Sequence, residues 1–224
     1  PASRIQAPQS LKDRADFWGT HSLPSAIDPG QYTLSLEGNV AVLEQALQLE
    51  AFNIGTGSKR LHIRREIQPI DDPLRLNSER PSDVRYCGYQ QTSVLTELNE
   101  TPVLSEVWNL VQLNPGGHLH ILTTGQVDAG DYFIPVPPEA HQLSDARIKI
   151  NITGKQQFKV GYKASCILGR MAYHNQLPSG ENYLLIRQFD SNPSATYSEE
   201  PPHSPGLNGF SVHVYNDDGG LGGF

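Results

Sequence analysis

The sequence predicts an all-β fold, a large antiparallel two-sheet sandwich. The first observation is composition: 20 glycines and 17 prolines in 224 residues favour many short strands joined by turns over long helices. The second is that apolar and polar residues alternate in short segments that turn signals separate. A chain of this length can bury the core of one β domain, so we expect a single domain over 1–224 with 1–30 as an irregular N-terminal strap.

The first strands are expected soon after the strap. The pattern becomes strand-like from Gln31, residues 32–37 alternate, and a Gly-Asn turn follows them. The periodicity of 40–52 allows helix or strand, and strand is favoured because its neighbours on both sides are strand-like. In 61–67, Leu61 and Ile63 lie on one face, and the intervening polar residues lie on the other. Segment 71–86 is polar and broken by proline, which predicts a loop.

The second half of the chain shows the same punctuation. Segments 89–98 and 103–113 are predicted as strand or short helix, and 114–117 as a turn. Segment 126–140 is predicted as a loop with aromatic residues. The remaining strands are expected at 118–122, 147–153, 158–163, 169–173, 183–189 and 210–215.

Charge and composition exclude several functions. The net charge of −7 and the pI of about 5.6 argue against nucleic-acid binding, and no apolar run reaches the ~20 residues of a membrane span. Cys87 and Cys166 form no CxxC pair, which excludes a zinc cluster built from cysteine alone. Two buried free thiols are favoured over a disulfide. No phosphate- or dinucleotide-binding glycine pattern is present, so no cofactor and no metal are expected, and the oligomeric state is left open.

Histidines supply the candidate acids. His118 and His120 are two residues apart on a predicted strand, so both side chains leave the same face. They could act as a catalytic acid, donate hydrogen bonds to a sugar, or bind a metal together with a third ligand. A solvated sheet face would give the same pattern. His213 precedes Asp217 and Asp218 and could form an acid/base pair, although Asp-Asp-Gly-Gly is also typical of a plain turn.

Cationic and aromatic residues supply candidate saccharide contacts. Arg64 shares a face with His62 and Glu66, which could bind hydroxyls or form a surface charge ladder. Lys163 and Arg187 lie on strand-like segments with aromatic neighbours, and Tyr132 lies on a long loop. Pyranose rings have apolar faces and hydroxyl edges, so an aromatic platform beside charged donors suits them. The alternative is that these aromatic residues belong to the core.

Four stretches together resemble the galactose mutarotase-like superfamily of aldose-1-epimerase type. They are 52–63, 107–117 with Trp108 and Pro-Gly-Gly, the pair 158–162 and 183–189, and 212–217. The resemblance implies a supersandwich whose concave sheet binds a sugar. It also implies a histidine acid and a carboxylate base near the C-terminus, yet the chain ends at Phe224, about where the base strand is expected.

The predicted function is carbohydrate recognition, with a saccharide or polyol as partner. One form is an aldose-epimerase-like enzyme with His118, His120 or His213 as the acid, and the alternative is a non-catalytic carbohydrate-binding or structural domain of a larger exported protein. The chain begins at Pro1, which favours an exported protein, whereas its low cysteine content fits either compartment. The residues expected to share one polar sheet face are Arg64, His118, His120, Lys163, Arg187, His213 and Asp217, with Tyr132 at the rim.

Overall fold

The structure is a computed structural model that describes residues 26–27, 29–50, 58–73, 83–101, 105–132, 134–195, 197 and 209–219. Described residues up to Asn109 belong to one compact unit (unit 1), and those from Leu110 onward belong to another (unit 2). The single domain over 1–224 stays a prediction, and all but the end of the predicted strap lies outside the described residues.

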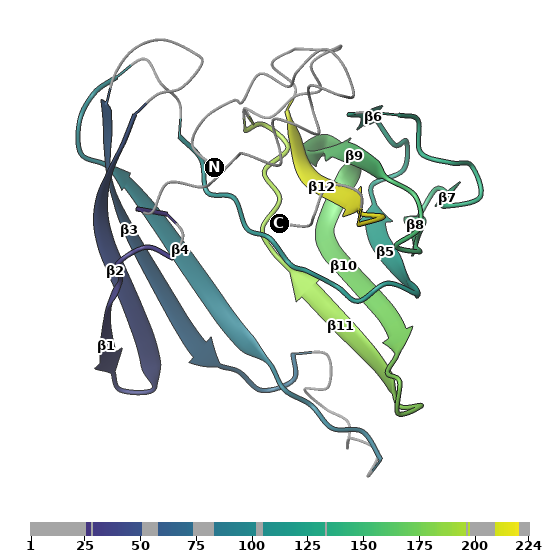
Figure 1. Cartoon of the computed structure of the whole chain (residues 1–224), viewed down its shortest axis with the longest axis horizontal. Coiled ribbons are helices and arrows are strands. Elements are labelled where there is room, and N and C mark those ends of the chain that lie inside the picture. Colours follow the sequence, from purple (N-terminus) through teal and green to yellow (C-terminus); the bar gives the residue numbers. More distant parts are fainter. Residues whose placement is uncertain are drawn as a thin grey trace. The chain divides into compact units, whose positions relative to one another are not determined.

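Unit 1 is a four-stranded antiparallel sheet in which each strand pairs with the next along the chain (Figure 1). Its strands are β1 (Thr33–Glu37), β2 (Val40–Glu50), β3 (Ser58–Pro69) and β4 (Tyr89–Glu97). Gly38, with φ of 65°, makes the tight turn between β1 and β2, a backbone conformation that glycine adopts without strain. Pairing of β2 with β1 and β3 holds its helix-compatible sequence in an extended form, as we predicted.

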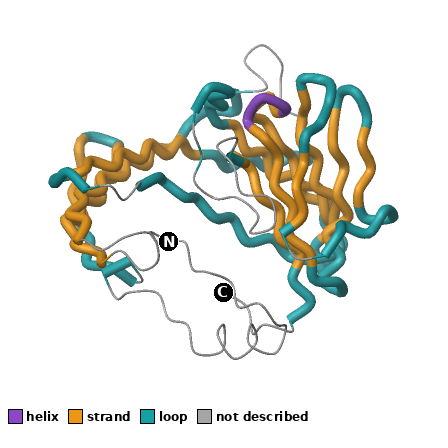
Figure 2. Tube along the Cα trace, turned by 90° about the horizontal axis from the view of Figure 1, so that it is seen from above, coloured by secondary structure: helices purple, strands orange, loops and turns teal. Residues whose placement is uncertain are grey.

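Unit 2 contains two antiparallel sheets. One has five strands in the order β11-β10-β5-β8-β7, and the other has three in the order β12-β9-β6. Strands are the main element in both units, and the single short helix described is the 3₁₀ turn η1 (Ala164–Cys166) (Figure 2). The strands of unit 2 are β5 (Gly117–Thr123), β6 (Ala129–Asp131), β7 (His141–Leu143), β8 (Arg147–Ile152), β9 (Phe158–Lys163), β10 (Ile167–Gln176), β11 (Asn182–Gln188) and β12 (Phe210–Asn216).

Buried side chains from both sheets of unit 2 form one core. Ile148 and Ile150 of β8 are fully buried, as are Phe158 and Tyr162 of β9 and Tyr173 of β10. Burying a large apolar side chain contributes roughly 1.5–3 kcal/mol, so this cluster is the main source of stability in the unit. The all-β prediction is confirmed. A core shared by two sheets is what a sandwich requires, whereas the mutarotase-like supersandwich stays a prediction.

The structure differs from the predicted elements in a few places. Residues 105–114 contain neither strand nor helix, although strand or short helix was predicted over 103–113. The predicted loop 126–140 contains the short strand β6, which pairs with β9. Both cysteines are free as predicted, but Cys87 is exposed and only Cys166 is buried. No helix in the described part of the chain has the length and apolarity that a membrane crossing requires.

Candidate binding site on the five-stranded sheet

The candidate site is the outer surface of the five-stranded sheet. Its central strand β5 alternates strictly, with Leu119 and Ile121 in the core. Because successive side chains of a strand leave opposite faces, His118, His120 and Leu122 point away from the core. The two histidines therefore share one face, as the sequence predicts.

Strand register brings further polar side chains beside these histidines. His118 pairs with Asn151 of β8 and His174 of β10, and His120 pairs with Lys149 of β8 and Ala172 of β10. Directly paired residues project from the same face of a sheet. We call this surface the basic face; its members are Arg147, Lys149 and Asn151 from β8, His118, His120 and Leu122 from β5, Arg170, Ala172 and His174 from β10, and Leu184, Ile186 and Gln188 from β11.

The basic face carries cations without carboxylates. None of its members is acidic, and in the described part of the chain neither Arg147 nor Lys149 nor Arg170 forms an ion pair. Partial burial lowers the pKa of His120 below its usual range, and the charges of Arg147 and Lys149 lower it further. His120 Nδ1 is buried and makes no hydrogen bond to any described residue. The basic face therefore carries Arg147, Lys149 and Arg170 as fixed cations, although the net charge of the whole chain is −7.

His118 is held in one orientation. Its Nδ1 lies 2.8 Å from Asn151 Oδ1, while Asn151 Nδ2 donates to the Glu139 carbonyl at 2.9 Å. Since the amide nitrogen is committed to a carbonyl, the amide oxygen accepts from His118 Nδ1–H. That tautomer leaves His118 Nε2 as the ring atom available to a ligand. No trio of histidine, cysteine or acidic side chains among the described residues is arranged to hold a metal ion.

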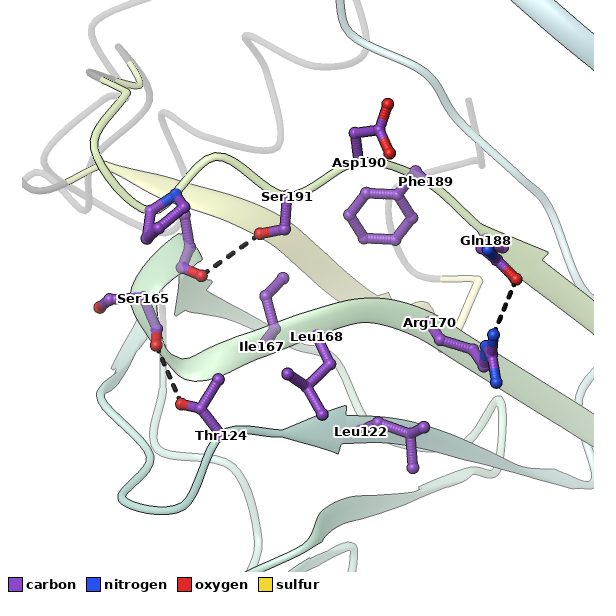
Figure 3. A pocket seen from close by; sticks show the side chains of 12 residues that line it. Leu122, Thr124, Ser165, Ile167, Leu168, Arg170, Gln188, Phe189, Asp190 and Ser191 are labelled. Atoms are coloured by element: carbon purple, nitrogen blue, oxygen red, sulfur yellow. Dashed lines mark hydrogen bonds between the residues drawn. The ribbon is translucent and has the colours of Figure 1, made fainter.

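An open pocket of about 550 Å³ lies at one end of the basic face (Figure 3). Leu122 and Leu168 provide apolar lining, and Arg170 donates to Gln188 Oε1 at 3.0 Å on one side of the pocket. Hydroxyl groups line the other end, where Thr124 donates to the Ser165 carbonyl at 2.9 Å and Ser191 to the Ala164 carbonyl at 3.3 Å. Asp190 supplies the carboxylate of the lining. The pocket thus combines an apolar surface with hydrogen-bonding groups.

A β-bulge in β10 shapes this pocket. The register between β10 and β5 shifts between Ile167 and Met171. Within this stretch Gly169 has φ of 66°, and a Cβ there would lie 2.2 Å from the Phe189 carbonyl oxygen. Glycine is therefore required on both conformational and steric grounds. The bulge lets the chain after β11 approach β10 and close one side of the pocket.

Arg64, a predicted saccharide ligand, lies instead in a cluster of carboxylates in unit 1. Its Nε donates to Glu66 at 2.8 Å, and its two terminal nitrogens reach Glu44 at 3.3 Å and Glu37 at 3.2 Å. His62 Nε2 lies 3.7 Å from the same Glu44 carboxylate. The hydrogen bonds that Arg64 donates to Glu66 and then to Glu37 raise the pKa of Arg64 above its usual value. We call His62, Arg64 and these three glutamates the paired face.

His213 and Tyr132 meet on the other sheet of unit 2. Their rings make an edge contact with centroids 5.5 Å apart, Phe210 lies 6.2 Å from Tyr132, and Lys159 Nζ lies 4.2 Å from the Tyr132 centroid. Tyr132 is only 7% exposed, so it is not the rim aromatic that we predicted. Lys163 forms an ion pair of 2.7 Å with Asp128. Because His213 pairs with Gly161 between core residues of β12, it leaves the sheet on the side away from the shared core.

The remaining predicted residues also lie elsewhere. Arg187 pairs with Met171, which packs on the core, so it leaves the five-stranded sheet on the side opposite to the basic face. Asp217 follows β12 and accepts a hydrogen bond from Gly219 N at 3.0 Å. The expected single surface is therefore wrong: of the predicted site residues, His118 and His120 lie on the basic face. Sequence reasoning missed Arg147, Lys149, Arg170 and His174, although Arg170, Ala172 and His174 alternate along the chain.

The comparisons with known proteins give no relative. The chain matches no protein-family model, no curated protein and no solved structure. The resemblance to mutarotase-like proteins is therefore left as a prediction.

Proposed function

We propose that this chain binds a saccharide on the basic face and in the pocket at its end. The observation that carries the proposal is the combination there of apolar side chains with fixed hydrogen-bond donors. Leu122 and Leu168 line the pocket, and Arg170 and Gln188 are already joined across its edge. A sugar ring presents apolar C–H surfaces and hydroxyl edges, and a site of this composition matches both.

The degree of preorganisation supports binding. His118 is oriented by Asn151, and Arg170 by Gln188, so little side-chain freedom is lost when a ligand docks. The strands beneath these residues are fixed by a fully buried core that includes Ile148 and Ile150. Groups held on strands keep their geometry better than groups on loops.

Binding without catalysis is favoured over epimerase chemistry. Proton transfer at an anomeric centre needs an acid and a base that reach one small ligand. His118 and His120 could serve as the acid, but no carboxylate projects from the basic face. Asp190 lines the pocket without a histidine among the lining residues. His213, the third predicted acid, lies on a different sheet.

The test combines a binding screen with an activity assay. The purified chain is screened against neutral and acidic oligosaccharides, and mutarotation of a range of aldoses is followed by polarimetry. We expect saccharide binding and no acceleration of mutarotation. A matched pair of variants locates the site: Gln188→Ala, at the edge of the pocket, should weaken binding, and Gln68→Ala, on a strand of unit 1, should not. Absence of binding to every saccharide would refute the proposed function.

A further inference from the structure

We infer that the ligand of the basic face is an acidic oligosaccharide whose charges are carboxylates, a uronate-containing chain. This inference rests on the proposed function and specifies its substrate class. It is carried by the juxtaposition of Arg147, Lys149 and Arg170 around His118, His120 and His174, with no acidic side chain projecting from the same strands.

The positions of the fixed cations suit an extended anionic ligand. Arg147 and Lys149 lie on β8, on one side of β5, and Arg170 lies on β10, on the other. Two strand spacings separate β8 from β10, about 10 Å at the usual inter-strand distance. A ligand that lies across β5 would therefore meet a cation on each side, with the histidines beneath it. Guanidinium groups form paired hydrogen bonds with carboxylates, which makes arginine well suited to this role.

The histidines add donors that respond to the ligand. The hydrogen bond of His118 Nδ1 to Asn151 leaves His118 Nε2 as the open ring position, whereas His120 Nδ1 is buried, so His120 would act on a ligand through its charge. A carboxylate beside His120 would favour the protonated form of that ring, and the open nitrogen of His118 is a further polar contact for a ligand. A neutral sugar could form hydrogen bonds with the same rings, but it would have no charge–charge interaction with Lys149.

The low number of permanent charges favours carboxylated over highly charged polymers. Arg147, Lys149 and Arg170 are the fixed cations of a face on a chain with a net charge of −7. A densely sulfated chain carries more negative charges per sugar than a uronate chain and would meet stronger long-range repulsion from the rest of the protein. The basic face also has no tyrosine, phenylalanine or tryptophan on which bases could stack, as single-stranded nucleic acids require.

The test measures affinity by calorimetry for four probes of equal length: an oligogalacturonate, its neutral counterpart, a sulfated oligosaccharide and single-stranded DNA. We expect the oligogalacturonate to bind at least about tenfold more tightly than the others, with an affinity that falls as salt is raised. Lys149→Gln with Arg170→Gln should weaken that binding roughly 30-fold or more, because each removes a hydrogen bond to a charged group. Arg60→Gln with Arg65→Gln removes two exposed arginines from β3 and should leave it unchanged.

Each other outcome has a defined meaning. Equal affinity for neutral and acidic oligosaccharides, with no effect of salt, would overturn the acidic-ligand inference and leave the proposed function standing. Tighter binding of the sulfated chain or of DNA would also overturn it. Absence of binding to any saccharide would overturn the proposed function itself. The salt dependence is measured on the unmodified chain, so the inference stays testable even if the double variant fails to fold.

Discussion

The paired face of unit 1 and the basic face of unit 2 both carry histidine and arginine side chains on antiparallel strands, but only the paired face also carries carboxylates. On the paired face, each of the three guanidinium nitrogens of Arg64 contacts a carboxylate. The partners are Glu37, Glu44 and Glu66. On the basic face, Arg147 and Lys149 flank His120 with no carboxylate projecting beside them. Arg64 on the paired face contacts carboxylates of the protein itself, whereas Arg147 and Lys149 on the basic face form no ion pair with a described residue.

The difference comes from cross-strand partners rather than from the strands that carry the cations. His62 and Arg64 on β3 alternate just as His118 and His120 do on β5. Glu44 lies opposite Arg64 on β2, whereas Lys149 lies opposite His120 on β8. This difference in cross-strand partners is why we propose the basic face, and not the paired face, as the binding surface.

The largest effect is expected when the basic face is given a carboxylate of its own. Ala172 lies between His120 and Ile186 in one cross-strand row. Ala172→Glu should place a negative charge among the cations and reduce affinity for oligogalacturonate by roughly 100-fold, since repulsion replaces attraction. Ala172→Gln adds similar volume without charge and should lose far less. Equal losses for both variants, measured by calorimetry, would show that shape rather than charge decides binding.

The next effect concerns the bulge that ends the basic face in a pocket. Gly169→Ala forces a left-handed backbone on a non-glycine residue and drives its Cβ into the Phe189 carbonyl, so the free energy of unfolding should fall by about 2–4 kcal/mol. Gly180 also has positive φ but no atom within 4 Å of the added Cβ, so Gly180→Ala should cost only about 1 kcal/mol. Urea denaturation measures both. If the two variants lost similar amounts of unfolding free energy, the backbone around Phe189 would be able to move away from the added Cβ, contrary to our expectation.

A smaller effect is expected from pH. His120 is surrounded by Arg147 and Lys149 on β8, His118 on its own strand and His174 on β10. Burial lowers the pKa of His120 in the free protein, and these neighbouring charges lower it further. A bound carboxylate favours the imidazolium, so binding takes up protons and tightens as pH falls. Because the pKa of His120 in the free protein lies below the ordinary histidine value of ~6.5, affinity for oligogalacturonate should rise about three- to tenfold as pH falls below that value. His120→Gln should flatten this dependence, and a rise retained in that variant would assign it to other groups.

The smallest effect is expected on the paired face. Glu66→Gln removes the carboxylate that contacts Arg64 Nε but leaves Glu37 and Glu44 in place, and it should leave oligogalacturonate affinity within about twofold. Calorimetry beside the unmodified chain measures this. A large gain in affinity would mean that the paired face also binds anions, and the contrast between the two surfaces would be lost.

Local patterns predict strands well, but they do not predict which strands become neighbours. Alternation along 61–67 and 118–122 assigns each side chain to a face, and the structure agrees on both segments. The grouping of Arg64, His118 and His213 on one sheet face was wrong because their strands belong to three different sheets, and alternation does not encode which strands pair. The same pairing brings Lys149 and His174 beside the predicted histidines, and no short segment of the sequence contains that information.

The most direct test of the basic face is to follow its histidines while a ligand binds. Side-chain imidazole signals of the ¹⁵N-labelled chain, assigned by single His→Gln variants, are recorded by NMR during titration with oligogalacturonate. We predict that signals of His118, His120 and His174 shift together and saturably, while those of His62 and His213 stay in place. Shifts at His213 or His62 without shifts at the other three would contradict the account.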